Sequence, residues 1–209
     1  PSRVIGCTVA SPTLAFSATK FFNDHDIPWE WVRSESVHEA EGFTLTNAYE
    51  RTGQLGPDRW YAAIGALSLF RGTPLLVVHA GTATTVDSLF QTGDGEYRFM
   101  GGRIAPGPAL MHKALLSAVP TLDSGLTEHK DFPLCSSDAI TTGIIDAQVG
   151  LITQAYESMC EAGQRPKIIL AGGSSRFLAP RLRTLHPTLI VRHNLVLGGL
   201  AQKVRESKR

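Results

Sequence analysis

The sequence predicts an α/β fold with a mixed β-sheet, on three observations. Short apolar runs typical of buried strands alternate with longer stretches in which apolar residues recur at helical spacing. Two neighbouring strand-like runs, 75–78 and 84–90, are close enough to pair as a hairpin, which adds antiparallel strands to a pattern of crossover helices. The 209 residues are 43% hydrophobic and 19% charged, as expected for a globular protein with a sizeable core.

The first part of the chain contains two expected helices. Pro12 opens one of them, and its apolar residues keep helical spacing, so they lie on one face of the helix. The second begins in the sequence GPDRW at 56–60 and continues with an alanine-rich apolar side. Strands are expected at 3–10 and 29–32, and the polar region 34–56 is assigned no regular element. The apolar face of the first helix consists of Leu14, Ala18, Phe21 and Phe22.

The sequence RGTP at 71–74 interrupts this pattern, so we place a boundary there between domains at 1–72 and 73–209. The Gly- and Pro-rich sequence GGRIAPGP at 101–108 predicts a loop, and 123–134 predicts a surface loop. The longest helix is expected at 137–161 because its apolar residues keep helical spacing. The remaining expected elements are strands at 97–100, 167–171 and 188–192 and helices at 108–118, 177–185 and 195–204.

Charge and cysteine content exclude several classes of protein. Lys and Arg number 20 against 19 Asp and Glu, a net charge of +1, which favours neither nucleic acid nor a membrane surface as partner. The three cysteines form no CxxC pair, so we expect no disulfide framework or zinc site, and a cytoplasmic location. No apolar run approaches the about 20 residues of a membrane helix, and no signal peptide is visible. The seven histidines show no metal-binding spacing.

The sequence HAGTATTVD at 79–87 places small and hydroxyl residues at the expected hairpin turn. Gly81 lets the backbone approach a ligand closely, and the threonines and free amides of the turn can receive phosphate oxygens. No lysine follows a glycine run and no helix starts here, so this is not a Walker loop. Taken alone, the stretch is more typical of an ordinary hairpin, because threonine is a common strand residue.

Two other sequences have both a structural and a chemical interpretation. Gly172 and Gly173 lie between a strand and a helix, where a nucleotide can rest against the helix N-terminus, and a tight structural turn explains them equally well. Asp58 starts a helix, where the N-cap role is the commoner one, although its carboxylate can also accept a proton from a substrate hydroxyl. Arg59 can hold a carboxylate or phosphate, and Tyr49 supplies a hydroxyl.

Taken together and in their order along the chain, the short sequence patterns of this protein closely resemble those of the type III pantothenate kinases, a family that includes proteins labelled Bvg accessory factors. The resemblance covers most of the chain, from about Gly6 to Gly199. It rests on Tyr49 with GPDR at 56–59, on AGTATTVD at 80–87, on GGRIAPG at 101–107, on Ser136 with Ala139, Ile140 and Gly143, on AGG at 171–173, and on LVLGGL at 195–200.

The resemblance implies an actin-like, acetate-and-sugar-kinase fold of two ribonuclease-H-like domains around a cleft. It implies a homodimer that uses ATP and Mg²⁺, often with a monovalent cation (K⁺ or NH₄⁺), to phosphorylate pantothenate to 4′-phosphopantothenate, the first step of coenzyme A biosynthesis. By matching position, Asp58 is the general base, Gly81 and Thr82 contact the ATP phosphates, and Gly172 and Gly173 flank the adenosine. Pantothenate is assigned to Tyr49, Gly56, Pro57, Asp58, Arg59 and Ser136, the last near or across the dimer interface.

The sequence departs from the family pattern in two places. The family begins with a strand that carries an Asp-x-Gly-Asn-Ser/Thr phosphate loop; this sequence contains none, so we expect a front segment to be absent from it. His79 stands where many members have an aspartate that binds the monovalent cation. Because K⁺ prefers hard oxygen ligands, either the cation dependence is lost or a protonated His79 replaces the charge, and a plain strand residue is equally open. Asp87 is the remaining candidate metal ligand.

Two other functions are compatible with the sequence. A non-catalytic regulator that keeps the kinase fold is favoured by the missing first phosphate loop and by His79. A kinase of the same superfamily with another hydroxylated substrate is disfavoured by the pairing of Tyr49 with GPDR.

Overall fold

The computed structural model describes residues 3–121 and 125–206. The described residues form two compact units. The first comprises the described residues of 1–72, 92–100 and 194–209, and the second comprises 73–91 and the described residues of 101–193. The expected domains at 1–72 and 73–209 stay a prediction.

The mixed sheet predicted from the sequence is confirmed. Seven strands follow one another in the order β3-β4-β7-β6-β5-β8-β9, and a separate parallel pair joins β1 to β2. Within the large sheet, β3–β4 and β5–β6 are antiparallel, whereas β4–β7, β5–β8 and β8–β9 are parallel. The strands are β1 (Val4–Gly6), β2 (Trp29–Trp31), β3 (Val37–Ala40), β4 (Phe43–Asn47), β5 (Leu75–Ala80), β6 (Ala83–Gly93), β7 (Glu96–Pro106), β8 (Lys167–Ala171) and β9 (Ile190–Val191).

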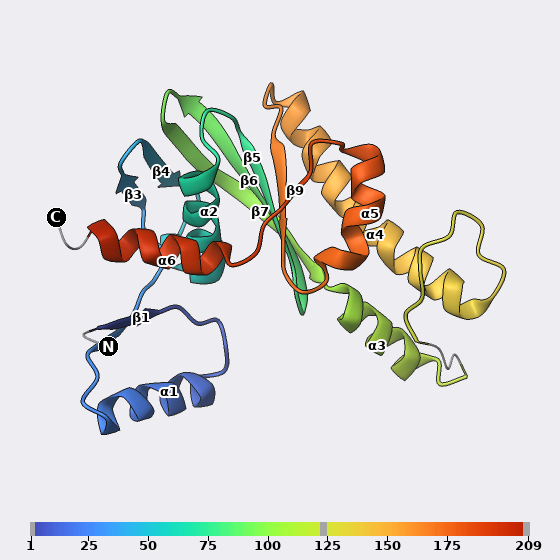
Figure 1. Cartoon of the computed structure of the whole chain (residues 1–209), viewed down its shortest axis with the longest axis horizontal. Helices are drawn as coiled ribbons and strands as arrows, with labels where there is room; N and C mark the ends of the chain where they lie inside the picture. The colour runs from blue at the N-terminus through green and yellow to red at the C-terminus, as the bar shows by residue number, and fades with distance from the viewer. Residues whose placement is uncertain (1–2, 122–124, 207–209) are drawn as a thin grey trace. The chain divides into compact units, whose positions relative to one another are not determined.

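In the first unit, helices α2 (Pro57–Leu69) and α6 (Leu195–Glu206) lie side by side (Figure 1). Two glycines allow this close approach. A Cβ at Gly65 would overlap the carbonyl oxygen of Leu195, and a Cβ at Gly199 would overlap that of Tyr61. The two helices therefore pack backbone against backbone, and this fixes α2, whose first turn carries the GPDR sequence.

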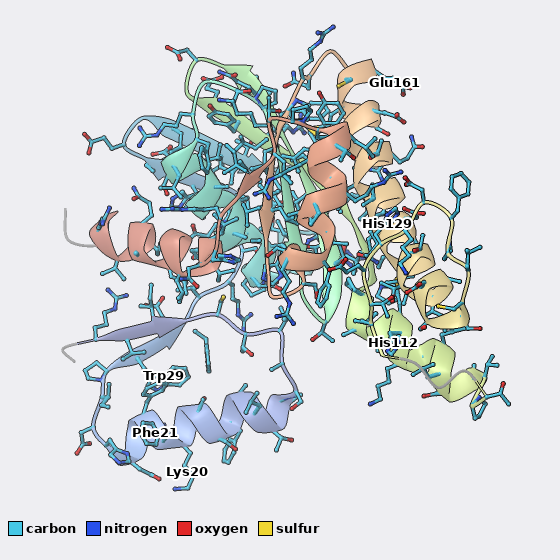
Figure 2. The ribbon with its side chains drawn as sticks, turned by 45° about the vertical axis from the view of Figure 1, so that its right-hand side comes forward. Lys20, Phe21, Trp29, His112, His129 and Glu161 are labelled. Atoms are coloured by element: carbon cyan, nitrogen blue, oxygen red, sulfur yellow. The ribbon has the colours of Figure 1, made fainter. Side chains whose placement is uncertain are left out.

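Helix α1 (Pro12–Asp24) forms where the sequence predicts it, with Ser11 as its N-cap. Of its apolar residues, Leu14 is 62% and Phe21 53% exposed. The helix contacts an aromatic group, since Phe22 stacks on Trp29 with ring centroids 5.7 Å apart. Figure 2 shows Trp29 beside α1.

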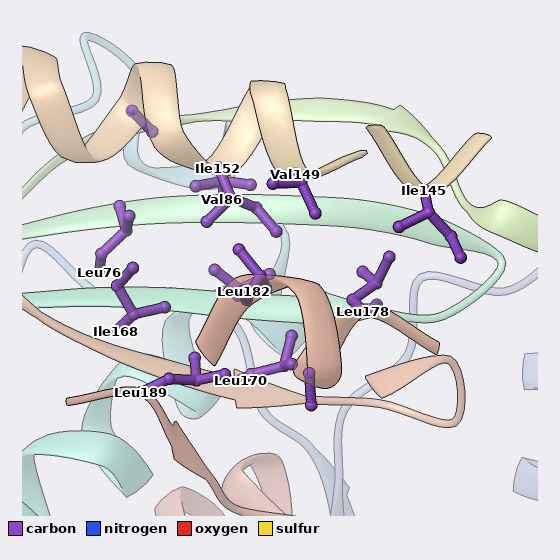
Figure 3. Close-up of a cluster of buried hydrophobic side chains, with 14 of the residues drawn as sticks. Leu76, Val86, Ile145, Val149, Ile152, Ile168, Leu170, Leu178, Leu182 and Leu189 are labelled. Atoms are coloured by element: carbon purple, nitrogen blue, oxygen red, sulfur yellow. The ribbon is translucent and has the colours of Figure 1, made fainter. Parts of the chain in front are cut away.

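The core of the second unit lies between strands β5, β6 and β8 and the helices α4 (Ser136–Glu161) and α5 (Ser175–Leu185) (Figure 3). Alternate residues of β5 point to this side, and α4 contributes the apolar positions that keep helical spacing. Full burial of each large side chain contributes about 1.5–3 kcal/mol to stability. The cluster includes Leu76, Val78, Val86, Ile145, Val149, Ile152, Ile168, Leu170, Leu178 and Leu182.

Two sequence assignments are corrected by the structure. The region 34–56 contains strands β3 and β4 and a short 3₁₀ turn, Thr52–Gln54, and the alternation in FTLTN at 43–47 is the signal that was available for β4. The expected loop at 101–108 is wrong over 101–106, because β7 continues through Pro106. Gly101 takes a φ of 136°, which glycine adopts readily, so the strand runs on past the two glycines. Helix α3 (Pro108–Ala118) starts as predicted.

Residues 123 and 124 of the expected surface loop lie outside the described residues, and 125–134 contain no helix or strand. Across the described part of the chain, no helix combines the length and the apolar character that crossing a membrane requires.

Candidate active site

Asp58 lies in the first turn of α2 and is half-buried. The N-cap is Gly56, whose carbonyl accepts hydrogen bonds from the amides of Arg59 and Trp60, so the alternative role of Asp58 as N-cap is wrong. A Cβ at Gly56 would lie 2.6 Å from Oδ1 of Asp58. The carboxylate is therefore turned back over Gly56, and a glycine there leaves room for it.

The structure brings the side chains of Arg59 and Tyr49 together. The guanidinium Nη1 of Arg59 donates to the hydroxyl of Tyr49 at 2.9 Å, and its Cζ lies 5.7 Å from the ring centroid of Phe99. Arg59 is only 6% exposed. Its observed contacts thus position Tyr49, whereas a direct contact with substrate stays a prediction.

Cys7 is the residue near Asp58 that sequence reasoning missed. Burial and, second, the negative charge of Asp58 raise the pKa of the Cys7 thiol to about 11. No local sequence pattern indicates that Cys7 and Asp58 are close in space, because they are far apart along the chain. The thiol is therefore neutral at physiological pH.

We expect Cys7 to react slowly with iodoacetamide until the pH approaches about 11, because the thiolate is the reactive form. In Asp58→Asn, the charge is removed while the burial remains, so the Cys7 pKa falls and the reaction accelerates at a given alkaline pH. Peptide mapping of alkylation rates against pH measures this, with exposed Cys135 as internal reference. Identical Cys7 profiles in the two proteins would refute the proximity.

The second unit carries the hairpin turn of Gly81 and Thr82 between β5 and β6. The amide of Gly107, the N-cap of α3, donates to the carbonyl of Thr82 at 2.8 Å. A Cβ at Gly107 would overlap the carbonyl oxygen of Gly81, so α3 starts directly against the turn. The side chain of Thr82 is exposed and available to a ligand. The sequence placed Gly107 in a family pattern but gave it no role.

The Gly172-Gly173 turn lies against the same end of β5. Gly172 has a φ of 95°, and a Cβ on it would overlap the carbonyl oxygen of Ala80. That carbonyl accepts a hydrogen bond from the amide of Ser174 at 3.0 Å. Both glycine-containing segments that the sequence associates with the nucleotide therefore meet within the second unit, in front of the N-terminus of α5.

His79 interrupts an otherwise buried strand, since it is the exposed residue of β5. Its ring lies against the turn, because a Cβ on Gly81 would be 3.3 Å from Cε1 of His79. The register pairs His79 with Thr85 and Val77 with Asp87, so His79, Thr85 and Asp87 share one face of the sheet. Asp87 is 1% exposed. Within 3–121 and 125–206, no group of three His, Cys, Asp or Glu side chains is arranged to hold a metal.

Ser136 is the first residue of α4 and is exposed. Near it, Nζ of Lys130 lies 2.6 Å from Oδ2 of Asp138. The hydrogen bond that Lys130 donates to Asp138, together with their opposite charges, lowers the pKa of Asp138 and raises that of Lys130. The ion pair thereby holds the segment before α4 against the first turn of this helix.

The chain is similar to known proteins over most of its length. The family model described as "Type III pantothenate kinase" matches residues 1–158. The chain belongs to the type III pantothenate kinase family. A type III pantothenate kinase of Polaromonas sp. is 35% identical over 207 residues, which are 97% of this chain and 77% of the relative. Another, of Azoarcus sp., is 36% identical over 202 residues, which are 95% of this chain and 71% of the relative.

Among solved structures, a Baf family protein from Campylobacter jejuni superposes with a TM-score of 0.64 at 20% identity, covering 100% of this chain and 84% of that one. This likeness concerns the fold alone. Membership of the type III pantothenate kinases makes the protein an enzyme whose class of reaction is phosphoryl transfer. This family membership also confirms the actin-like fold class that the resemblance implies. Tyr49, Gly56, Pro57, Asp58 and Arg59 lie in the first unit of this pantothenate kinase, and Gly81, Thr82, Ser136, Gly172 and Gly173 lie in the second.

Proposed function

We propose that the protein transfers the γ-phosphoryl group of ATP to the hydroxyl of pantothenate, producing 4′-phosphopantothenate and ADP. The family membership over most of the chain carries this proposal. Phosphoryl transfer needs positioned groups and compensated charge more than covalent chemistry, and the described residues supply both kinds of group.

Asp58 acts as general base in this proposal. Its carboxylate is half-buried, sits over Gly56 at the start of a rigidly packed helix, and so is held in one place to accept the hydroxyl proton. Tyr49, fixed by the 2.9 Å hydrogen bond from Arg59, offers its hydroxyl to the polar groups of pantothenate. Gly56 and Pro57 shape the backbone around them.

The turn of Gly81 and Thr82 receives the phosphates in the same proposal. Gly81 has no side chain to shield the turn, and the exposed Thr82 adds a hydroxyl donor. Gly172 and Gly173, against the same strand end, flank the adenosine. Mg²⁺, when bound with ATP, would supply charge neutralisation on the phosphates.

A homodimer is part of the proposal. Phe132 and Leu134, 88% and 97% exposed, lie four and two residues before Ser136. Exposed apolar side chains of this size favour contact with a partner, and such a contact would place Ser136 beside a second copy. Sedimentation of the protein and of Leu134→Asp tests it: a dimer that the substitution weakens supports the proposal, and a monomer contradicts it.

We expect turnover to be independent of K⁺ and NH₄⁺, because His79 offers an imidazole where cation-binding members of the family have a carboxylate. His79→Asp is expected to make turnover rise when K⁺ is added, since the carboxylate provides a hard oxygen ligand next to the turn. Initial rates in Na⁺ and K⁺ buffers of matched ionic strength measure both effects. Strong K⁺ activation of the unchanged protein would contradict this account of His79.

The acceptor is tested by comparing ADP formation with pantothenate and with other hydroxy acids of similar size. We expect pantothenate to give by far the highest kcat/KM. Preference for another acceptor would support the related kinase with a different substrate. Absence of turnover with every acceptor, in a folded protein, would support the non-catalytic regulator.

A further inference from the structure

Gln148 is a buried polar residue of α4 to which neither the sequence nor the proposed function gives a role. It is 1% exposed and lies on the same helix as the core residues Ile145, Val149 and Ile152. Burial of an amide side chain is unfavourable unless hydrogen bonds replace those that it makes with water. The partners of Gln148 therefore indicate what this residue holds in place.

The side-chain amide of Gln148 holds the segment that joins β7 to α3. Its Nε2 donates to the carbonyl oxygen of Pro106 at 2.9 Å and lies 3.0 Å from Sδ of Met111. Gly107 lies between these two residues, and its carbonyl accepts a hydrogen bond from the amide of Met111 at 2.9 Å. Both sides of Gly107 are thus attached to α4, which packs against α3 (Figure 1).

One rigid group connects Gln148 to the turn of Gly81 and Thr82. The carbonyl of Pro106 and the amide of Gly107 belong to the same planar peptide. Its oxygen accepts from Gln148, and its N–H donates to the carbonyl of Thr82 at 2.8 Å. Because both ends are engaged, this peptide cannot rotate without breaking a hydrogen bond. A continuous chain of hydrogen bonds therefore runs from α4 to the turn.

The direction of the Thr82 carbonyl matters for an anionic ligand. A carbonyl oxygen carries a partial negative charge and repels phosphate, whereas backbone amides and hydroxyls attract it. The hydrogen bond from Gly107 keeps this oxygen turned toward the start of α3, and the side chain of Thr82 stays exposed. The peptide that Gln148 fixes thus controls which groups of the turn face a phosphate.

The other end of the Gln148 side chain favours a positioning role over a purely structural one. Oε1 is buried and has no hydrogen-bond partner among the described residues. An unpartnered buried oxygen destabilises the folded state, so an apolar side chain of the same length would fill this position at lower cost. Methionine would fill the space, but it would not supply the hydrogen-bond donor to Pro106.

We propose that Gln148 is a positioning residue for phosphoryl transfer. It fixes the peptide between Pro106 and Gly107, and through this peptide it holds the turn of Gly81 and Thr82 in the conformation that receives the phosphoryl donor. The proposal rests on the proposed binding of the ATP phosphates at this turn. Substitution of Gln148 then weakens the binding of phosphate groups, although the residue acts on them only through the peptide.

The test compares the binding of inorganic tripolyphosphate and of adenosine by calorimetry. Gln148→Met keeps the length of the side chain and removes its donors, and Gln154→Met, at an exposed position of the same helix, is the matched control. We expect Gln148→Met to weaken tripolyphosphate binding about tenfold, which corresponds to about 1.4 kcal/mol, and to leave adenosine binding unchanged. The control is expected to match the unchanged protein with both ligands. Thermal unfolding establishes that both variants are folded.

Gln148→Glu provides a second, reversible test. An ionised carboxylate only accepts hydrogen bonds, whereas a protonated carboxyl also donates one, and burial raises the pKa of a carboxyl. As the pH falls from about 8 to about 5, we expect the tripolyphosphate affinity of Gln148→Glu to recover toward that of the unchanged protein at the same pH. Gln148→Met, which has no donor at any pH, is expected to show no such recovery. An unchanging affinity ratio for Gln148→Glu would contradict the donor role of this position.

Equal tripolyphosphate affinity in Gln148→Met and Gln154→Met would overturn the positioning role while leaving ATP use intact. A loss of adenosine binding as large as that of tripolyphosphate binding would reveal a general disturbance of the fold and would overturn it as well. If the unchanged protein binds no tripolyphosphate, the proposed phosphate site fails together with this inference.

Discussion

Asp58→Asn is expected to lower kcat by about 100- to 10,000-fold, because the amide cannot accept the proton of the substrate hydroxyl. The KM for ATP is expected to stay unchanged, since the substitution keeps the size of the side chain and removes only its basicity. Single-turnover measurements with saturating ATP and pantothenate separate the chemical step from binding.

The matched control is Asp94→Asn, which changes an exposed aspartate in the turn between β6 and β7 of the same unit. It is expected to keep full activity. Circular dichroism and thermal unfolding establish that both variants are folded. Equal turnover in Asp58→Asn and the unchanged protein would remove Asp58 from the mechanism.

Gly172→Ala is expected to lower the free energy of unfolding by about 2–5 kcal/mol. The left-handed backbone costs an alanine about 1–2 kcal/mol, and the overlap of its Cβ with the carbonyl of Ala80 adds a packing penalty of about 1–3 kcal/mol. Urea denaturation of the two proteins measures the difference.

Gly173→Ala is the neighbouring control, because a Cβ there meets no atom within 4 Å. Its unfolding free energy is expected to stay within about 0.5 kcal/mol of the unchanged protein. If both alanine variants were equally stable, the backbone contact between the Gly172 turn and β5 would not have the energetic importance assigned to it.

Elements governed by local signals were predictable from the sequence. Pro12, Pro57 and Pro108 each occupy the first turn of a helix, and the long amphipathic stretch became α4. The strand predicted from the sequence ended before GGRIAPGP because that sequence contains strong turn residues. In the structure, hydrogen bonding within the sheet, a tertiary effect, extends β7 through these residues.

The sequence proposes the candidate site as a set of residues, but it does not give their geometry. The order of the short patterns singled out Asp58, Tyr49 and Gly172. None of these patterns reveals that Cys7 lies near Asp58 or that Gly107 packs on the turn at Gly81. These contacts join residues distant along the chain, and a single sequence has no local signal for them. Arg59 of α2, which positions Tyr49 through a hydrogen bond, likewise contacts Phe99 of β7, and no local pattern reveals this contact.

The central claim is that the protein phosphorylates pantothenate with ATP. Incubation of the purified, folded protein with ATP, Mg²⁺ and pantothenate, followed by mass spectrometry of the small molecules, tests it most directly. The account predicts equal amounts of ADP and of pantothenate that has gained one phosphoryl group on its hydroxyl. Recovery of unmodified pantothenate and undiminished ATP would contradict it.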